Sequence, residues 1–139
     1  MNMHNLMSSK ISTVQALTES RTRNFRSFQD LSTQEFGIAM ENICNTTKSD
    51  LTFYTPEGKV FRSTTPEVFE KMVLGSRINQ EAYHNICRLN QRFYIHREKI
   101  ADYSYWALYA PIFNDNQDLL AIICVPYTTQ NYDFRREAF

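Results

Sequence analysis

The chain has 139 residues, enough for one domain with a sizeable core and too few for two comfortable ones. Its 15 Lys and Arg balance 15 Asp and Glu, which argues against the strongly basic surface of a nucleic-acid-binding protein. The sequence contains neither GxGxxG nor GxxxxGK followed by Ser or Thr, so those two kinds of nucleotide binding are excluded. It also has no run of 18 apolar residues that would span a membrane.

Residues 1–30 are predicted to form a leading amphipathic helix. Its stripe follows a spacing of three and four residues and includes two polar positions; the members are Ile11, Val14, Thr18, Arg21, Phe25 and Phe28. Because the polar residues interrupt the stripe, we expect that this helix cannot bury a continuous face within one subunit. The pattern therefore favours contact between the leading helices of two copies.

A second helix is predicted after the sequence Ser32–Glu35, which has the spacing of a capping box. The apolar positions of this helix are Phe36, Ala39, Met40 and Ile43. From Asp50 the pattern changes to strands, at 51–55 and 60–63, and the turn Pro56–Lys59 between them predicts a hairpin. Two short helices are expected next, from Thr65 to about Val73 and from Ile78 to Leu89 with Asn79 as N-cap.

The last third of the chain is richest in strands. We predict strands at 93–100, 103–113 and 119–127, and the polar turn Asn114–Gln117 joins the last two. Both of these strands are apolar on both faces, so they should be adjacent, central and covered on both sides. The fold class is therefore α+β, with a five-stranded antiparallel sheet, a long N-terminal helix and short helices between strands two and three.

Five segments of the chain follow one another as a succession of motifs. They are Asp50–Gly58 followed by Ser63-Thr64, Asn79–Tyr83, 97–105, Tyr109–Ile112 and Val125–Tyr127. This succession resembles the PAS-like (Cache) sensor domains of Bacteroidetes-type membrane sensor histidine kinases, in which the first segment is similar to a hairpin and the second to the "INPEAY" helix start. The likeness covers about residues 10–130, and no single motif in it is catalytic.

The resemblance implies an extracytoplasmic, periplasmic input domain that relays the binding of a small molecule or a partner across the membrane. It divides the chain into the leading helix (1–30), a sensor domain (31–132) and a polar exit segment (133–139). In such proteins membrane helices flank the domain, so we expect the sequence to be a piece of a longer sensor. A homodimer through the leading helix is implied as well. The alternative is a structural dimerisation module without a small-molecule ligand.

An enzyme would need a nucleophile with a base, a pair of carboxylates or a metal set. His84 and Cys87 are three residues apart on a predicted helix, but no second pair completes four ligands, so we expect no metal and no cofactor. Cys44, Cys87 and Cys124 fit neither a disulfide framework nor a zinc site, and small buried side chains are the simplest interpretation, with one disulfide left open. We therefore expect no catalytic activity and no nucleic-acid partner.

A ligand pocket between the sheet and the helices after the second strand is what the resemblance implies. Tyrosines offer an apolar wall with a polar tip, and an arginine can bind a carboxylate through two hydrogen bonds. The residues of those types that we expect to line the pocket are Arg77, Tyr83, Arg88, Tyr94, Tyr105 and Tyr109. Each of the two arginines is a candidate to bind an anionic group.

Overall fold

The computed structural model describes residues 2–65, 77–100 and 103–127. The elements in chain order are α1 (Met3–Thr22), the 3-10 helix η1 (Phe28–Ser32), α2 (Gln34–Thr47), β1 (Thr52–Tyr54), β2 (Val60–Ser63), α4 (Gln80–Tyr83), the π-helical turn η3 (His84–Arg88), β3 (Tyr94–Ile100), β4 (Tyr103–Phe113) and β5 (Leu119–Tyr127). The order confirms the predicted α+β class. The predicted helix from Thr65 to Val73 and the exit segment 133–139 lie outside the described residues.

The five strands form one antiparallel sheet in the order β2-β1-β5-β4-β3. Strands β4 and β5 pair from Trp106–Tyr127 to Phe113–Leu119, so their predicted adjacency is confirmed. The turn between them is held by Asn114, whose Oδ1 accepts hydrogen bonds from the backbone N–H groups of Asn116 and Asp118 at 2.9 Å each. The polar tetrapeptide thus closes the hairpin as the sequence predicted.

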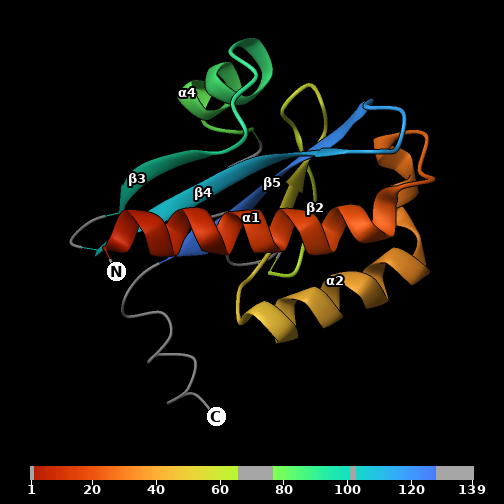
Figure 1. Ribbon diagram of the computed structural model, residues 1–139, viewed down its shortest axis with the longest axis horizontal. Helices are drawn as coiled ribbons and strands as arrows, with labels where there is room; N and C mark the ends of the chain where they lie inside the picture. The colour runs from red at the N-terminus through yellow and green to blue at the C-terminus, as the bar shows by residue number, and fades with distance from the viewer. Residues whose placement is uncertain (1, 66–76, 101–102, 128–139) are drawn as a thin grey trace.

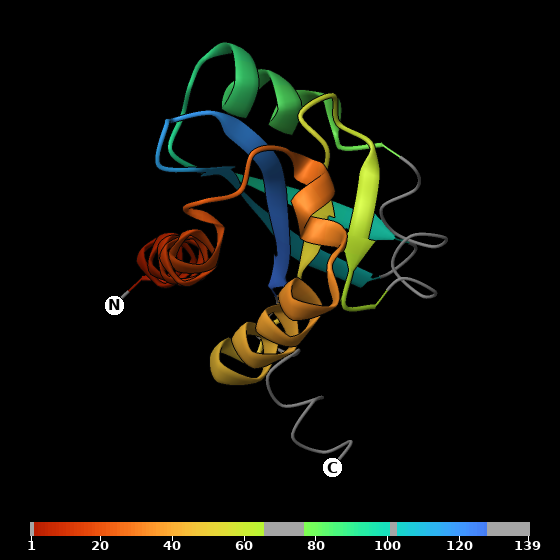
Figure 2. The same cartoon turned by 90° about the vertical axis from the view of Figure 1, so that its right-hand side faces the viewer.

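Helices cover both faces of the sheet. Helices α1 and α2 lie on one face, and α4 with η3 lies on the other (Figures 1 and 2). The strand residues alternate between the two layers: Leu108, Ala110, Ile112, Ile123 and Val125 face α1 and α2, whereas Tyr105, Ala107, Tyr109, Ile122 and Cys124 face α4 and η3. The expectation that β4 and β5 are central and covered on both sides is therefore confirmed.

Helix α1 is shorter than predicted, because it ends at Thr22 and not near residue 30. A new helical turn, η1, follows the N-cap Ser27, whose hydroxyl accepts a hydrogen bond from the N–H of Gln29 while the Asp30 carboxylate accepts from the N–H of Ser27. This capping box redirects the chain. Phe25 therefore lies in the connection and Phe28 in η1, so the prediction of one helix over residues 1–30 is wrong.

The buried stripe of α1 packs within its own subunit. Ile11, Val14 and Thr18 have no exposed surface, and the Thr18 hydroxyl donates to the carbonyl of Val14 at 2.8 Å, which satisfies it inside the core. Arg21 is exposed, and Thr22 takes the next buried position. The prediction that this helix cannot bury a continuous face in one subunit is therefore wrong.

The N-cap of helix α2 is Thr33, one residue later than the predicted cap Ser32. The Thr33 hydroxyl accepts the N–H of Phe36 at 3.1 Å, whereas the Ser32 hydroxyl donates back to the carbonyl of Gln29 at 2.7 Å. Since Ser32 closes η1, it is not free to cap α2, and Glu35 stays exposed. The predicted apolar face is correct, because Phe36, Ala39, Met40 and Ile43 are all buried.

Candidate functional site

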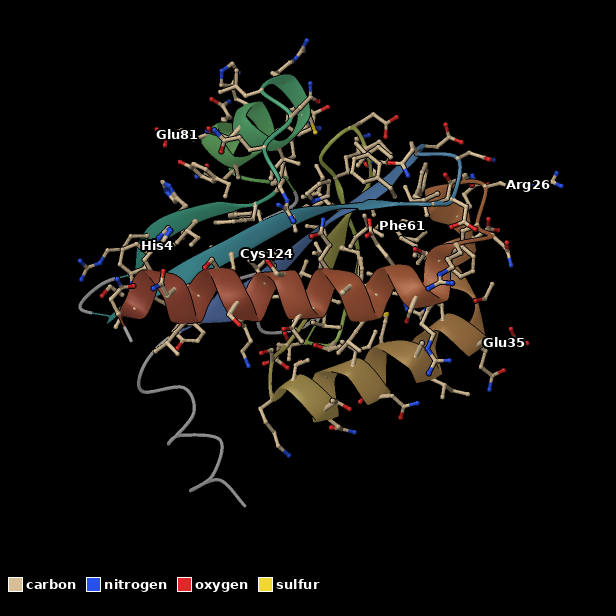
Figure 3. The ribbon with its side chains drawn as sticks, in the orientation of Figure 1. His4, Arg26, Glu35, Phe61, Glu81 and Cys124 are labelled. Atoms are coloured by element: carbon tan, nitrogen blue, oxygen red, sulfur yellow. The ribbon has the colours of Figure 1, made fainter. Side chains whose placement is uncertain are left out.

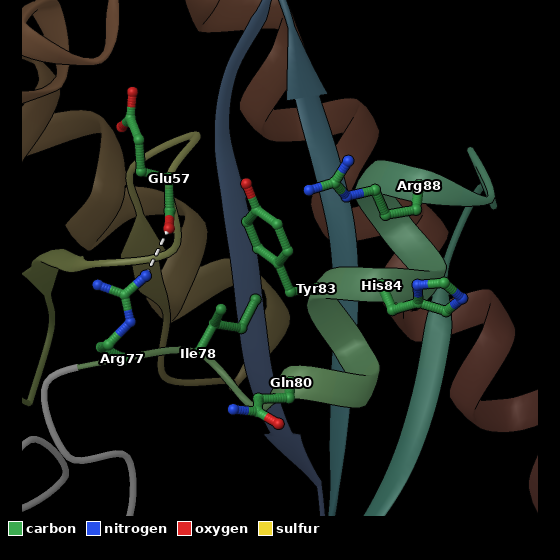
Figure 4. A pocket seen from close by; sticks show the side chains of 7 residues that line it. All are labelled: Glu57, Arg77, Ile78, Gln80, Tyr83, His84 and Arg88. Carbon is green, nitrogen blue, oxygen red and sulfur yellow. Dashed lines mark hydrogen bonds between the residues drawn. The ribbon is translucent and has the colours of Figure 1, made fainter.

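A cavity of about 360 Å³ lies where the β1–β2 turn meets the start of α4 and η3. Its lining residues are Glu57, Arg77, Ile78, Gln80, Tyr83, His84 and Arg88 (Figure 4). The structure thus brings together three of the six predicted site residues, Arg77, Tyr83 and Arg88. They come from three places in the chain: the strand-like segment beside the β1–β2 turn, α4 and η3.

Gly58 sets how closely the turn approaches the cavity. It has a φ of 92°, which favours glycine, and its carbonyl accepts the N–H of Ile78 at 2.8 Å. A Cβ at this position would lie 2.8 Å from the Ile78 side chain and 3.2 Å from the Tyr83 ring. Only glycine therefore lets the turn pack against both residues and position Glu57 at the rim.

The cavity carries more positive than negative groups. Arg77 is exposed and donates through Nη2 to the backbone carbonyl of Glu57 at 3.0 Å, which positions its guanidinium without neutralising it (Figure 4). Arg88 is exposed and makes no ion pair with any described residue. His84 adds a third basic side chain, and among the described lining residues Glu57 supplies the one carboxylate. Such an arrangement favours an anionic ligand.

Tyr83 forms the wall between the two arginines (Figure 4). Its hydroxyl donates to the carbonyl of Pro56 at 2.8 Å, which fixes α4 against the turn. Burial, and in second place the neighbouring Cys87, raises the pKa of Tyr83, so its hydroxyl stays protonated. The predicted N-cap of this helix is confirmed, because Asn79 Oδ1 accepts the N–H of Ala82 at 3.0 Å.

Tyr105 and Tyr109 lie deeper, in the core layer between the sheet and α4. Their side chains are 5% and 1% exposed, and neither lines the cavity that holds the arginines. Burial raises the pKa of both phenols well above the ordinary range. Tyr109 is the register partner of Cys124 on the neighbouring strand β5. Strand alternation predicts the correct face for both tyrosines but not their depth.

Tyr94 belongs to a polar cluster that joins β3 to α4. Its hydroxyl donates to Glu81 Oε2 at 3.1 Å, and the His96 ring lies 3.7 Å from Glu81 and 3.6 Å from Glu98. Asn79 Nδ2 reaches the same Glu98 carboxylate at 3.4 Å. Glu81 stands on the outer side of α4 (Figure 3). The cluster therefore fixes α4 to the edge strand β3, outside the cavity.

Sequence reasoning missed Glu57, Ile78 and Gln80 as cavity residues, and considered His84 only as half of a metal site. The signal for Glu57 was its place in the Pro-Glu-Gly turn, beside the glycine that contacts α4. Within the described residues, no group of three or more His, Cys, Asp or Glu side chains is arranged to hold a metal ion. Cys44 and Cys124 are buried and Cys87 is half-buried, and none of the three forms a disulfide with a described residue.

No helix in residues 2–65, 77–100 and 103–127 combines the length and the apolar character needed to cross a membrane. The comparison with curated proteins gave no match. Solved structures with a similar fold are sensor domains of bacterial receptors.

The sensor domain of DcuS from E. coli has a TM-score of 0.56 at 12% identity, over 93% of this chain and 96% of that one. The periplasmic sensory domain of the Campylobacter jejuni chemoreceptor Tlp1 has a TM-score of 0.54 at 11% identity, over 97% of this chain and 59% of that one. The sensory domain of Tlp3 from the same organism, solved with isoleucine bound, has a TM-score of 0.50 at 15% identity, over 91% of this chain and 57% of that one.

At these identities the likeness concerns the fold, and the chain spans a little over half the length of the two chemoreceptor domains. The family comparison is more direct. The family model of single Cache domain 3 matches residues 32–138, from the end of η1 through the whole sheet, and so includes every residue of the arginine-lined cavity. The chain therefore belongs to the single Cache domain 3 family.

Proposed function

We propose that this domain is the extracytoplasmic, periplasmic input module of a membrane sensor histidine kinase, and that it binds a small organic anion. The observation that carries the proposal is the cavity whose described lining combines Arg77, Arg88 and His84 with one carboxylate, that of Glu57. Support for sensing comes from the Cache family and from the fold shared with sensor domains, one of them solved with isoleucine bound. The kinase context rests on the motif resemblance of residues 10–130.

The position of the cavity suits a relay. Its walls come from α4 and η3 on one side and from the β1–β2 turn on the other, and β1 pairs directly with β5. A ligand that draws the two walls together changes how α4 sits on the sheet. It shifts the population only by its differential affinity for the two arrangements.

A homodimer through α1 is part of the proposal. Since the inner stripe of α1 is occupied by its own sheet, a second copy would meet the apolar residues that α1 leaves exposed, among them Met3 at 39% and Leu6 at 44%. A structural dimerisation module without a ligand remains the second candidate function. The exposed apolar residues on α1 favour it, and failure to find any ligand would support it.

A thermal-shift screen over amino acids, organic acids and sugars tests the proposal, because a ligand that binds the folded state raises Tm by mass action. We expect organic acids to stabilise the domain. Arg77→Ala and Arg88→Ala should each weaken the binding of the best compound by about tenfold or more without lowering the Tm of the free protein.

Arg26→Ala is the matched control, because this exposed arginine extends from the far side of the molecule (Figure 3). It should bind like the wild type. If no compound raises Tm, or if the arginine variants bind as the wild type does, the ligand-sensing proposal is refuted.

A further inference from the structure

A second, larger cavity of about 540 Å³ lies on the other side of η3. It is bounded by the second half of α1, by the segment from Ile86 to Arg92, and by the end of β4 with the following turn. It shares no residue with the cavity of Arg77 and Arg88. All of its lining residues belong to the described part of the chain.

The walls of this cavity are held in place by side chains of α1. Strand β3 pairs with β4 only as far as Tyr109, so on this side the rest of β4 has no described strand beside it, although β5 pairs with its other edge. Gln15 Nε2 donates to the carbonyl of Pro111 at 2.8 Å, and the Glu19 carboxylate accepts the N–H of Phe113 at 2.8 Å. Helix side chains thus replace the missing strand, and Pro111 suits this edge because it has no N–H to satisfy.

Two guanidinium groups line the cavity from different elements. Arg23 ends α1, and its carbonyl accepts the N–H of Asp115 at 3.0 Å, which fixes its backbone. Arg92 precedes β3. Both side chains are exposed, and among the described residues neither forms an ion pair or a side-chain hydrogen bond. Their positive charge is therefore available to a ligand.

The two carboxylates in the wall do not cancel these charges. Glu19 already accepts the N–H of Phe113, and its burial raises its pKa. Asp115 lies on the exposed turn and forms no ion pair with either arginine. Between these polar groups the wall is apolar, with Ala16, Ile86, Pro111 and Phe113.

We propose that this cavity is a second ligand site, which binds a small carboxylate with an apolar body through Arg23 and Arg92. The carboxylate would meet the guanidinium groups, and the apolar part would lie against the wall formed by Ile86 and Phe113. Because α1 and β4 both contribute to the wall, a bound molecule would act directly on the joint between the leading helix and the sheet.

Benzoate and its neutral isostere benzamide are suitable probes, and the amide N–H signals of Phe113 and Asp115 in NMR titrations report on the cavity. We expect benzoate to bind at least about tenfold more tightly than benzamide, and Arg23→Ala and Arg92→Ala each to weaken benzoate by about tenfold. Arg77→Ala should leave this binding unchanged, which separates the result from the proposed function.

Equal binding of benzoate and benzamide, or wild-type affinity in both arginine variants, would overturn the proposal. Loss of benzoate binding in Arg77→Ala with retention in Arg92→Ala would also overturn it, because the probe would then occupy the first cavity. Thermal unfolding of each variant without probe identifies any loss of fold. Arg23→Lys and Arg92→Lys, which keep the charge but not the paired hydrogen bonds, should bind benzoate with intermediate affinity.

Discussion

The guanidinium of Arg62 lies directly over the backbone of Gly37. A Cβ built on Gly37 would be 2.5 Å from Arg62 Nη2, and Arg62 Nη1 donates to the carbonyls of Leu31 at 2.6 Å and Thr33 at 2.8 Å. One side chain from β2 thus binds the end of η1 and the start of α2. Because Gly37 has no side chain, the Arg62 guanidinium has room to bind there.

Gly37→Ala should destabilise the domain by about 1 kcal/mol, although alanine normally favours a helix interior by a similar amount. The added methyl displaces the guanidinium, which then loses its bonds to the two carbonyls. In an Arg62→Ala background the same change should stabilise the protein. Urea unfolding of the four proteins in this cycle checks the sign reversal, and a destabilising effect in both backgrounds would contradict it.

Glu19→Gln should make the domain more stable at neutral pH. Burial raises the pKa of Glu19, and the bond from Phe113 N–H opposes this only in part. A raised folded-state pKa means that the stability contributed by protonated Glu19 is present below its ordinary pKa and is lost as pH rises through the raised value. A glutamine keeps the acceptor for Phe113 without the charge. Unfolding free energies of the two proteins should agree at about pH 4 and diverge by about pH 7; a constant difference would contradict the prediction.

Phe28→Glu should lower the stability of the fold, whereas Leu6→Glu should weaken dimerisation. Phe28 packs edge-on against Phe61 with ring centroids 5.1 Å apart, so a glutamate there should cost about 2–3 kcal/mol of stability. Leu6 is 44% exposed on α1, so its replacement should change stability by less than about 0.5 kcal/mol while weakening a dimer formed through that helix. Sedimentation velocity and chemical denaturation of both variants separate the two effects. Unchanged association of Leu6→Glu would remove α1 as the dimer contact.

Cys87 should react with iodoacetamide before Cys124. Cys87 is half-buried, whereas Cys124 lies in the middle of the sheet, and burial raises the pKa of Cys124 to about 12. Since the thiolate is the reactive form, Cys87 should be alkylated first and Cys124 only on unfolding. Peptide mass spectrometry over time reads the order. Early modification of Cys124 in the folded protein would show that β5 opens readily.

Local patterns were sufficient to predict the sheet. The two-faced apolarity of β4 and β5, with a polar turn between them, predicts that the two strands pair, whereas the register shift between Ile112 and Phe113, beside the turn, was not predicted. The ends of the helices were harder to predict from the sequence. Ser27 with Asp30 and Ser32 with Glu35 have the same spacing, and only the course of the chain around Leu31 makes the first pair the true capping box.

The cavity could be predicted only in part. Glu57 and Arg77 are far apart in sequence. They meet because Gly58 adopts a positive φ and its carbonyl accepts a hydrogen bond from the N–H of Ile78. No local pattern encodes that contact. Tyr109 shows the opposite case, because strand alternation gives its face while the packing of α4 decides that it is buried.

The side-chain hydrogen bonds from α1 to the edge of β4 that faces away from β5 fix the position of the helix along the strand. Gln15 and Glu19 are one turn apart, and they meet Pro111 and Phe113, which are two residues apart on the strand. A slide of α1 by about one turn, roughly 5.4 Å, would bring the apolar Ile11 or the acidic Glu19 to the Pro111 carbonyl, and neither side chain in its usual ionisation state donates a hydrogen bond. Intermediate positions would lose both bonds. A piston motion of the leading helix must therefore carry β4 with it, so the hinge of any signalling movement lies outside this joint.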